Sequence, residues 1–193
     1  MPTFLSDPSP AFTFVLLLVA VVAVGVWYRF RDKTSRNRMI VVVAVVFAAL
    51  LIGYFVDSPR EQAEKHVQEM VTAATKQDPE GFLKHVSESF EAYGSNKAKL
   101  RTSPAWGLIK QYSADITAFN FQRNLFKEIN PNEIEVVFTA KATSKTDGGL
   151  LMRYCQSRWV KESDGQWRLK GIKFFDPADG GMNKESPIPG FPN

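Results

Sequence analysis

The sequence predicts an α+β protein, in which an N-terminal hairpin of two transmembrane helices precedes a domain of about three helices and four antiparallel strands. Three observations support this. Two long apolar runs lie within the first 56 residues. The spacing of apolar residues changes from a helical period to strict alternation near Asp115. Turn-forming residues separate the alternating segments that follow.

The apolar runs Phe12–Tyr28 and Met39–Phe55 contain no charged residue. At 1.5 Å per residue, each run spans about 26 Å as a helix, slightly less than a hydrocarbon core of about 30 Å. Aromatic residues at the ends of the runs, such as Trp27 and Tyr54, suit the membrane interface and cover the shortfall. Both runs are therefore predicted to span a bilayer.

Two other interpretations fit these runs less well. A secretory signal peptide carries positive charge before its apolar segment, whereas Asp7 is the only charged residue among the first ten here. A buried helix of a soluble core keeps a polar face, whereas these runs are apolar all round. One span plus a re-entrant segment remains the alternative.

The positive charge of the chain is concentrated in the segment 29–38 between the two runs. The whole chain has a net charge of +4, but residues 57–193 carry 19 basic and 18 acidic side chains. Such a connecting loop is expected in the cytoplasm, so the N-terminus and the C-terminal domain are expected on the extracytoplasmic side. The nearly neutral domain argues against binding of nucleic acid. Binding of lipid head groups by the loop is the alternative explanation of its five basic residues, which are Arg29, Arg31, Lys33, Arg36 and Arg38.

Three helices are predicted in the first half of the domain. Ser58 and Glu61 form a capping box before an apolar stripe at helical spacing that continues to about Lys76. Asp78 starts a second helix, which is predicted to continue to Phe90. A short third helix follows Ser103-Pro104. The apolar stripe of the first helix comprises Ala63, Val67, Met70, Val71 and Ala74.

Four strands are predicted between Asp115 and Phe175. Gly171 lies where the alternation of apolar residues in the last strand changes parity, which predicts a β-bulge.

The chain is predicted to divide into a hairpin over 1–56, a domain over 57–177 and a Pro/Gly-rich tail over 178–193. The tail is predicted to be disordered, with a short docking motif as the alternative.

Two segments resemble the nuclear transport factor 2-like, or SnoaL-like, superfamily: Lys76–Phe90 (KQDPEGFLKHVSESF) and Arg158–Pro177, which contains Asp164-Gly165 followed by Trp167. The resemblance covers about residues 59–177. It implies a cone-like domain whose curved sheet wraps a long helix and leaves a pocket that is used for catalysis, ligand binding or dimerisation. A cystatin-like fold has similar sequence patterns, and fold alone does not establish function.

The resemblance also implies an acid–base group inside the cone of the family's enzymes, assisted by a tyrosine. The candidate pocket residues are Tyr112, Asp115, Asn120 and Gln156. Asp115 fits a turn better than catalysis, and the polar residues fit a solvated sheet face, so no catalytic residue is assigned.

No cofactor or metal site is expected, because the two histidines, His66 and His85, and the single Cys155 lack the spacing of metal ligands. Two functions are considered, and the sequence favours the first because no catalytic group is evident. The first is an interaction or scaffold domain, which binds a protein partner or dimerises through its sheet. The second is a small-molecule-binding or isomerase/dehydratase-like domain, which requires an open cavity.

Overall fold

The computed structural model describes residues 10–55, 58–145, 148–179, 182 and 184–186. The chain divides into two compact units, Met1–Pro59 and Arg60–Asn193, and each is described here by itself.

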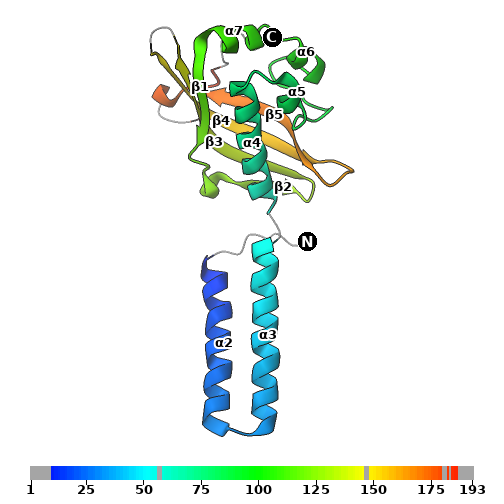
Figure 1. Ribbon diagram of the computed structural model, residues 1–193, viewed down its shortest axis with the longest axis vertical. Coiled ribbons are helices and arrows are strands. Elements are labelled where there is room, and N and C mark those ends of the chain that lie inside the picture. Colours follow the sequence, from blue (N-terminus) through cyan, green and yellow to red (C-terminus); the bar gives the residue numbers. More distant parts are fainter. Residues whose placement is uncertain (1–9, 56–57, 146–147, 180–181, 183, 187–193) are drawn as a thin grey trace. The chain divides into compact units, whose positions relative to one another are not determined.

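The first unit is a helical hairpin of α2 (Pro10–Phe30) and α3 (Lys33–Phe55), which lie side by side (Figure 1). Both helices are long and apolar enough to cross a membrane, over Phe12–Phe30 and Lys33–Leu51. Their large apolar side chains are mostly exposed, as Val21 (70%) and Phe47 (61%) illustrate. A helix with apolar residues exposed all round suits a lipid environment.

The connection between the two helices is shorter than the predicted loop 29–38. Only Arg31 and Asp32 lie outside the helices, so the other basic residues of this segment belong to helix ends. Arg31 takes a left-handed backbone conformation (φ 52°), which ends α2. The Asp32 carboxylate then accepts a hydrogen bond from the Ser35 amide (3.1 Å) and caps α3.

The second unit begins with α4 (Pro59–Thr75), the long helix that lies across the sheet (Figure 1). The predicted apolar stripe is confirmed, because Ala63, Val67, Met70 and Ala74 are buried.

The short helix α5 (Pro79–Leu83) follows α4 and is capped by Asp78, which accepts a hydrogen bond from the Gly81 amide (3.0 Å). The prediction that this helix continues to Phe90 is wrong. The backbone after Leu83 pairs with the last strand instead: Leu169 donates to the His85 carbonyl and Ser87 donates to the Leu169 carbonyl.

Two more short helices precede the sheet. The helix α6 (Lys97–Arg101) was not predicted from the sequence and is capped by the Asn96 side chain. The helix α7 (Ala105–Tyr112) occupies the position predicted for the third helix.

The sheet is antiparallel, with the strand order β1-β3-β4-β5 and a fifth short strand, β2, that also pairs with β3. The predicted α+β class is confirmed, and β2 adds to the four predicted strands. The bounds are β1 Ser113–Phe119, β2 Lys127–Asn130, β3 Glu133–Ser144, β4 Leu150–Lys161 and β5 Trp167–Phe175.

The predicted bulge at Gly171 is present. Arg158 of β4 is opposite Gly171, but its neighbour Trp159 is opposite Leu169, so Lys170 is the additional residue. The Lys170 carbonyl accepts a hydrogen bond from the Glu91 amide (2.9 Å), which ties the segment after α5 to the bulge. A Cβ atom at Gly171 would lie 3.0 Å from the Glu91 carbonyl oxygen, so this close approach favours glycine.

The tail 178–193, predicted to be disordered, lies mostly outside the described residues. Within its described part, Glu185 forms a β-bridge with Phe175, and the Ser186 amide donates to the Phe174 carbonyl (2.7 Å).

Candidate functional site

A cavity of about 360 Å³ lies between the sheet and the helices of the second unit. Its wall comes from α4, α5, α6 and α7 on one side and from β1, β3, β4 and β5 on the other. Most described lining residues are apolar, and the non-apolar ones are Ser103, Lys141, Arg153, Cys155 and Ser157.

Small side chains on β3 account for the position of the cavity. Ile134, Val136 and Phe138 fill one end of the inward-facing side of β3 and are almost fully buried. Farther along the same side, the next two residues of the strand are Ala140 and Ala142, and both line the cavity. Alanine leaves the space that a branched or aromatic residue would occupy, so the core remains unfilled at this end of the sheet.

Aromatic residues of the short helices cover the cavity opposite the sheet. Phe82 of α5 and Trp106 of α7 meet edge to face, with ring centroids 5.4 Å apart. The Trp106 indole also donates to the Leu100 carbonyl of α6 (2.8 Å). Three short helices are thereby joined into one wall.

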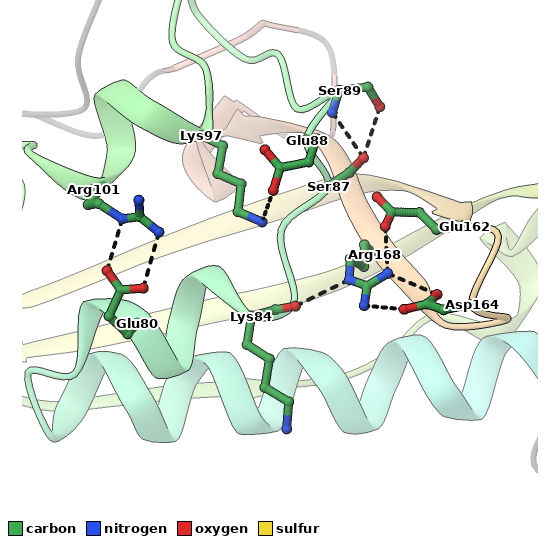
Figure 2. A network of polar contacts seen from close by, with 10 residues as sticks. All are labelled: Glu80, Lys84, Ser87, Glu88, Ser89, Lys97, Arg101, Glu162, Asp164 and Arg168. Carbon is green, nitrogen blue, oxygen red and sulfur yellow. Dashed lines mark hydrogen bonds and ion pairs between the residues drawn. The ribbon is translucent and has the colours of Figure 1, made fainter.

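Polar contacts on the surface fasten this helical segment to the sheet (Figure 2). Arg101 of α6 binds both carboxylate oxygens of Glu80 in α5, at 2.9 and 3.1 Å. Arg168 of β5 donates to the Lys84 carbonyl that follows α5 and also binds Asp164 at the β4–β5 turn. The hydrogen bond from Arg168 lowers the pKa of Asp164 to about 2.

The inward-facing residues of β4 form the floor of the cavity. Leu151, Cys155 and Trp159 were predicted on one side of this strand, and all three line the cavity. Ser157 lies between them and is fully buried, with its hydroxyl donating to the Val136 carbonyl (2.8 Å). Burial raises the pKa of the Cys155 thiol to about 12, so it remains protonated and unreactive near neutral pH.

Arg153 is the inward-facing charged residue of β4, opposite Ala140 of β3. Its side chain is 15% exposed. The Nη1 atom donates to the Met152 carbonyl (2.8 Å) and lies 3.3 Å from Oδ2 of Asp176. The Nε atom is buried and has no hydrogen-bond partner among the described residues.

Three of the four candidate pocket residues taken from the sequence, Asp115, Asn120 and Gln156, are not among the residues that line the cavity. Asp115 is exposed and pairs with Thr143, on the sheet face opposite the cavity. Asn120 follows the end of β1, exposed and with a left-handed backbone (φ 54°). Gln156 alternates with the lining residues of β4 and so faces the opposite side. The Tyr112 side chain lies outside the described part of the structure.

Arg153 was missed as a pocket residue, although its position in the strand indicates that it faces inward. Leu151, Arg153 and Cys155 share one side of a strand, so an arginine within that apolar row was a visible signal. The candidates chosen from the sequence include a carboxylate and two amides, and of these Asp115 and Gln156 lie on the opposite face of the sheet.

The two histidines form a contact of their own beside α4, outside the cavity lining. Their rings lie 4.6 Å apart, and Nδ1 of His66 lies 2.8 Å from the Trp167 carbonyl oxygen. His85 is buried, and its Nε2 lies 2.9 Å from Glu69. Burial, together with the neighbouring His66, lowers the pKa of His85 to about 4. Among the described residues, no group of three or more His, Cys, Asp or Glu could hold a metal ion.

Comparison with known proteins identifies similar folds. No protein-family model matches the chain, and no curated protein matches it. A protein of unknown function from Mycobacterium tuberculosis is 18% identical with a TM-score of 0.49, covering 66% of this chain and 72% of that one. A protein of unknown function with a cystatin-like fold from Nostoc punctiforme is 14% identical, with a TM-score of 0.48 and coverage of 61% and 90%. A ketosteroid isomerase-like protein from Erwinia carotovora atroseptica is 14% identical, with a TM-score of 0.43 and coverage of 59% and 94%.

The second unit has a long helix packed on an antiparallel sheet, the arrangement that the resemblance in the sequence implies. At these identities the similarity concerns the fold alone, and it assigns no activity to the chain.

Proposed function

We propose that this protein is a membrane-anchored binding domain that takes up a small apolar molecule in the cavity between its helices and its sheet. The cavity is the observation that carries the proposal, since its volume of about 360 Å³ lies within the usual range of ligand pockets. Apolar side chains that line an empty cavity lose packing contacts, and a bound apolar ligand would restore part of them.

The lining favours binding over acid–base catalysis. None of the described residues that line the cavity is an aspartate, glutamate or histidine. Proton transfer by the mechanism of isomerases or dehydratases needs such a group within hydrogen-bond reach of the substrate. Neither of the two histidines of the chain, His66 and His85, lines the cavity.

The membrane anchor in this proposal is the α2–α3 hairpin, and the bilayer is its partner. The basic residues around the hairpin turn support a cytoplasmic turn, with the N-terminus and the second unit on the extracytoplasmic side. The second unit is nearly neutral and so attracts a polyanion only weakly, and the proposal therefore includes no nucleic-acid partner.

A scaffold role is the second candidate, in which the sheet binds a protein partner or a second copy of the chain. It draws support from exposed apolar residues on the sheet face opposite the cavity, Phe119 (41%) and Leu150 (56%). This role needs no ligand in the cavity, so ligand binding separates the two candidates.

The test is a titration of the full chain, in phosphatidylcholine nanodiscs, with octan-1-ol. Trp106 and Trp159 line the cavity, so tryptophan emission should change saturably as the probe enters. The variant Ala140→Leu places a larger side chain in the cavity and should weaken binding at least about tenfold while the domain remains folded. The control variant Ala178→Leu changes an exposed residue and should bind as the unmodified chain does. Absence of saturable binding, or equal binding by both variants, would refute the proposal.

A further inference from the structure

The cavity contains a cation in an otherwise mostly apolar wall. Arg153 faces inward from a central strand, next to Leu151 and Cys155 of the same side of β4. Burial of a guanidinium is unfavourable unless its N–H groups are hydrogen-bonded and its charge is balanced. An arginine at this position therefore calls for an explanation that core packing does not supply.

The described contacts satisfy this guanidinium only in part. A guanidinium has five N–H donors. In Arg153, Nη1 has two acceptors nearby, the Met152 carbonyl and Asp176, whereas the N–H of Nε is buried without an acceptor among the described residues. Leaving a buried donor unpaired costs about 1–3 kcal/mol, and an oxygen atom from a ligand would remove that cost.

We propose that the ligand is an amphiphile with an apolar body and one anionic oxygen group, and that Arg153 binds this group. The inference rests on the proposed ligand-binding function and deepens it. The apolar body occupies the space beside Ala140 and Ala142, and the anion accepts a hydrogen bond from the Arg153 guanidinium, whose Nε has no acceptor among the described residues. A volume of about 360 Å³ accommodates about a dozen groups the size of a water molecule, at about 30 Å³ each.

The other charged groups near the site are compatible with this arrangement. Asp176, the carboxylate partner of Arg153, is 35% exposed, so water can solvate it when the ligand anion approaches. Lys141 alternates with Ala140 and Ala142 along β3, so its side chain points to the opposite face of the sheet and adds no charge to the cavity. A cationic head group would instead be repelled by Arg153.

The experiment compares three probes of equal chain length: octanoate, octan-1-ol and octylamine. Each is titrated against the full chain in phosphatidylcholine nanodiscs, with tryptophan emission as the readout. Octanoate should bind about tenfold more tightly than octan-1-ol, and octylamine more weakly than either. Octyl phosphate, as a fourth probe, distinguishes a phosphate monoester from a carboxylate as the preferred anion.

Two variants test whether Arg153 causes the preference. Arg153→Met removes the charge while keeping an apolar stem, and should bring the affinity for octanoate down to that for octan-1-ol. The control is Arg158→Met, which removes an arginine from the opposite face of the same strand and should keep the preference. If Arg153→Met does not fold, the ratio between octanoate and octan-1-ol in the unmodified chain still tests the proposal.

The outcomes distinguish failure of the proposed anion recognition by Arg153 from failure of the proposed ligand binding in the cavity. Equal binding of octanoate and octan-1-ol by the unmodified chain, or an unchanged preference in Arg153→Met, would overturn the role of Arg153 while the apolar cavity stands as a binding site. Failure of all probes to bind would overturn the proposed function as well.

Discussion

The indole N–H of Trp159 donates a hydrogen bond to the hydroxyl of Ser157 over 2.9 Å, and that hydroxyl donates in turn to the Val136 carbonyl. Both side chains are fully buried and both line the cavity. Because each polar atom has a partner within the sheet, this part of the cavity wall presents an apolar surface to a ligand. Arg153, two positions beyond Cys155 on the same face, is left as the polar contact point.

Ser157→Ala removes the acceptor of the Trp159 indole without changing the volume of the strand much. The free energy of unfolding should fall by about 1–3 kcal/mol, because a buried N–H is left unpaired. Urea denaturation followed by tryptophan fluorescence measures this loss. Ser163→Ala, an exposed position in the β4–β5 turn, is the control and should change stability by less than about 0.5 kcal/mol. Equal stability of the two variants would contradict the role given to the Ser157 hydroxyl.

Gly171→Ala should destabilise the domain by about 1 kcal/mol or more. The added Cβ would lie 3.0 Å from the Glu91 carbonyl oxygen, whose residue is held in place by the hydrogen bond to Lys170. The comparison is Gly107→Ala in α7, where a Cβ meets nothing within 4 Å and alanine favours the helix. Thermal unfolding should show a lower midpoint for the first variant and an unchanged or higher midpoint for the second. The reverse order would argue against a close approach at the bulge.

Acidification should weaken the domain through His85. Its pKa is about 4 in the folded chain and about 6.5 ordinarily, so the unfolded chain binds the proton more readily. The contribution to stability is therefore complete above about pH 6.5 and is lost as the pH falls towards 4. Four charged or titratable groups act on this ring: His66, Glu69, Lys84 and Arg168.

The expected loss between pH 7 and pH 4.5 is about 2 kcal/mol, with allowance for screening by solvent. Denaturant unfolding at several pH values measures it in the unmodified chain and in His85→Gln. The variant should be less sensitive to pH over this interval. Identical pH dependence in both proteins would show that another group is responsible.

The orientation of the hairpin can be tested with single cysteines, because Cys155 is buried and its thiol has a pKa of about 12. A membrane-impermeant maleimide added to intact cells should label Ser163→Cys, in the exposed β4–β5 turn. It should not label Asn37→Cys near the hairpin turn until the membrane is permeabilised. Labelling of the unmodified chain would contradict the burial of Cys155, and the opposite pattern in the two variants would reverse the proposed orientation.

Several features of the fold follow from local sequence. The helical spacing of Ala63, Val67 and Met70 determined the buried side of α4, and Gly171 marked the bulge where the parity of β5 changes. These features depend on periodicity and on the conformational freedom of glycine, which short stretches of sequence display. The two apolar runs predicted the hairpin helices for the same reason.

Pairing between distant segments decided the rest. The helix predicted to reach Phe90 ends at Leu83, because the backbone of His85 and Ser87 bonds to Leu169 more than 80 positions away, and local propensity cannot reveal that competition.

The site shows the same division between sequence and tertiary structure. The order of residues along β4 put Arg153 and Gln156 on opposite faces, but only the packing of α4 and α7 against the sheet decided which face encloses a cavity. The two apolar runs and the basic residues between them established the hairpin from composition alone. The cavity exists because the small residues Ala140 and Ala142 of β3 lie beneath separate helices, which is a property of the folded chain.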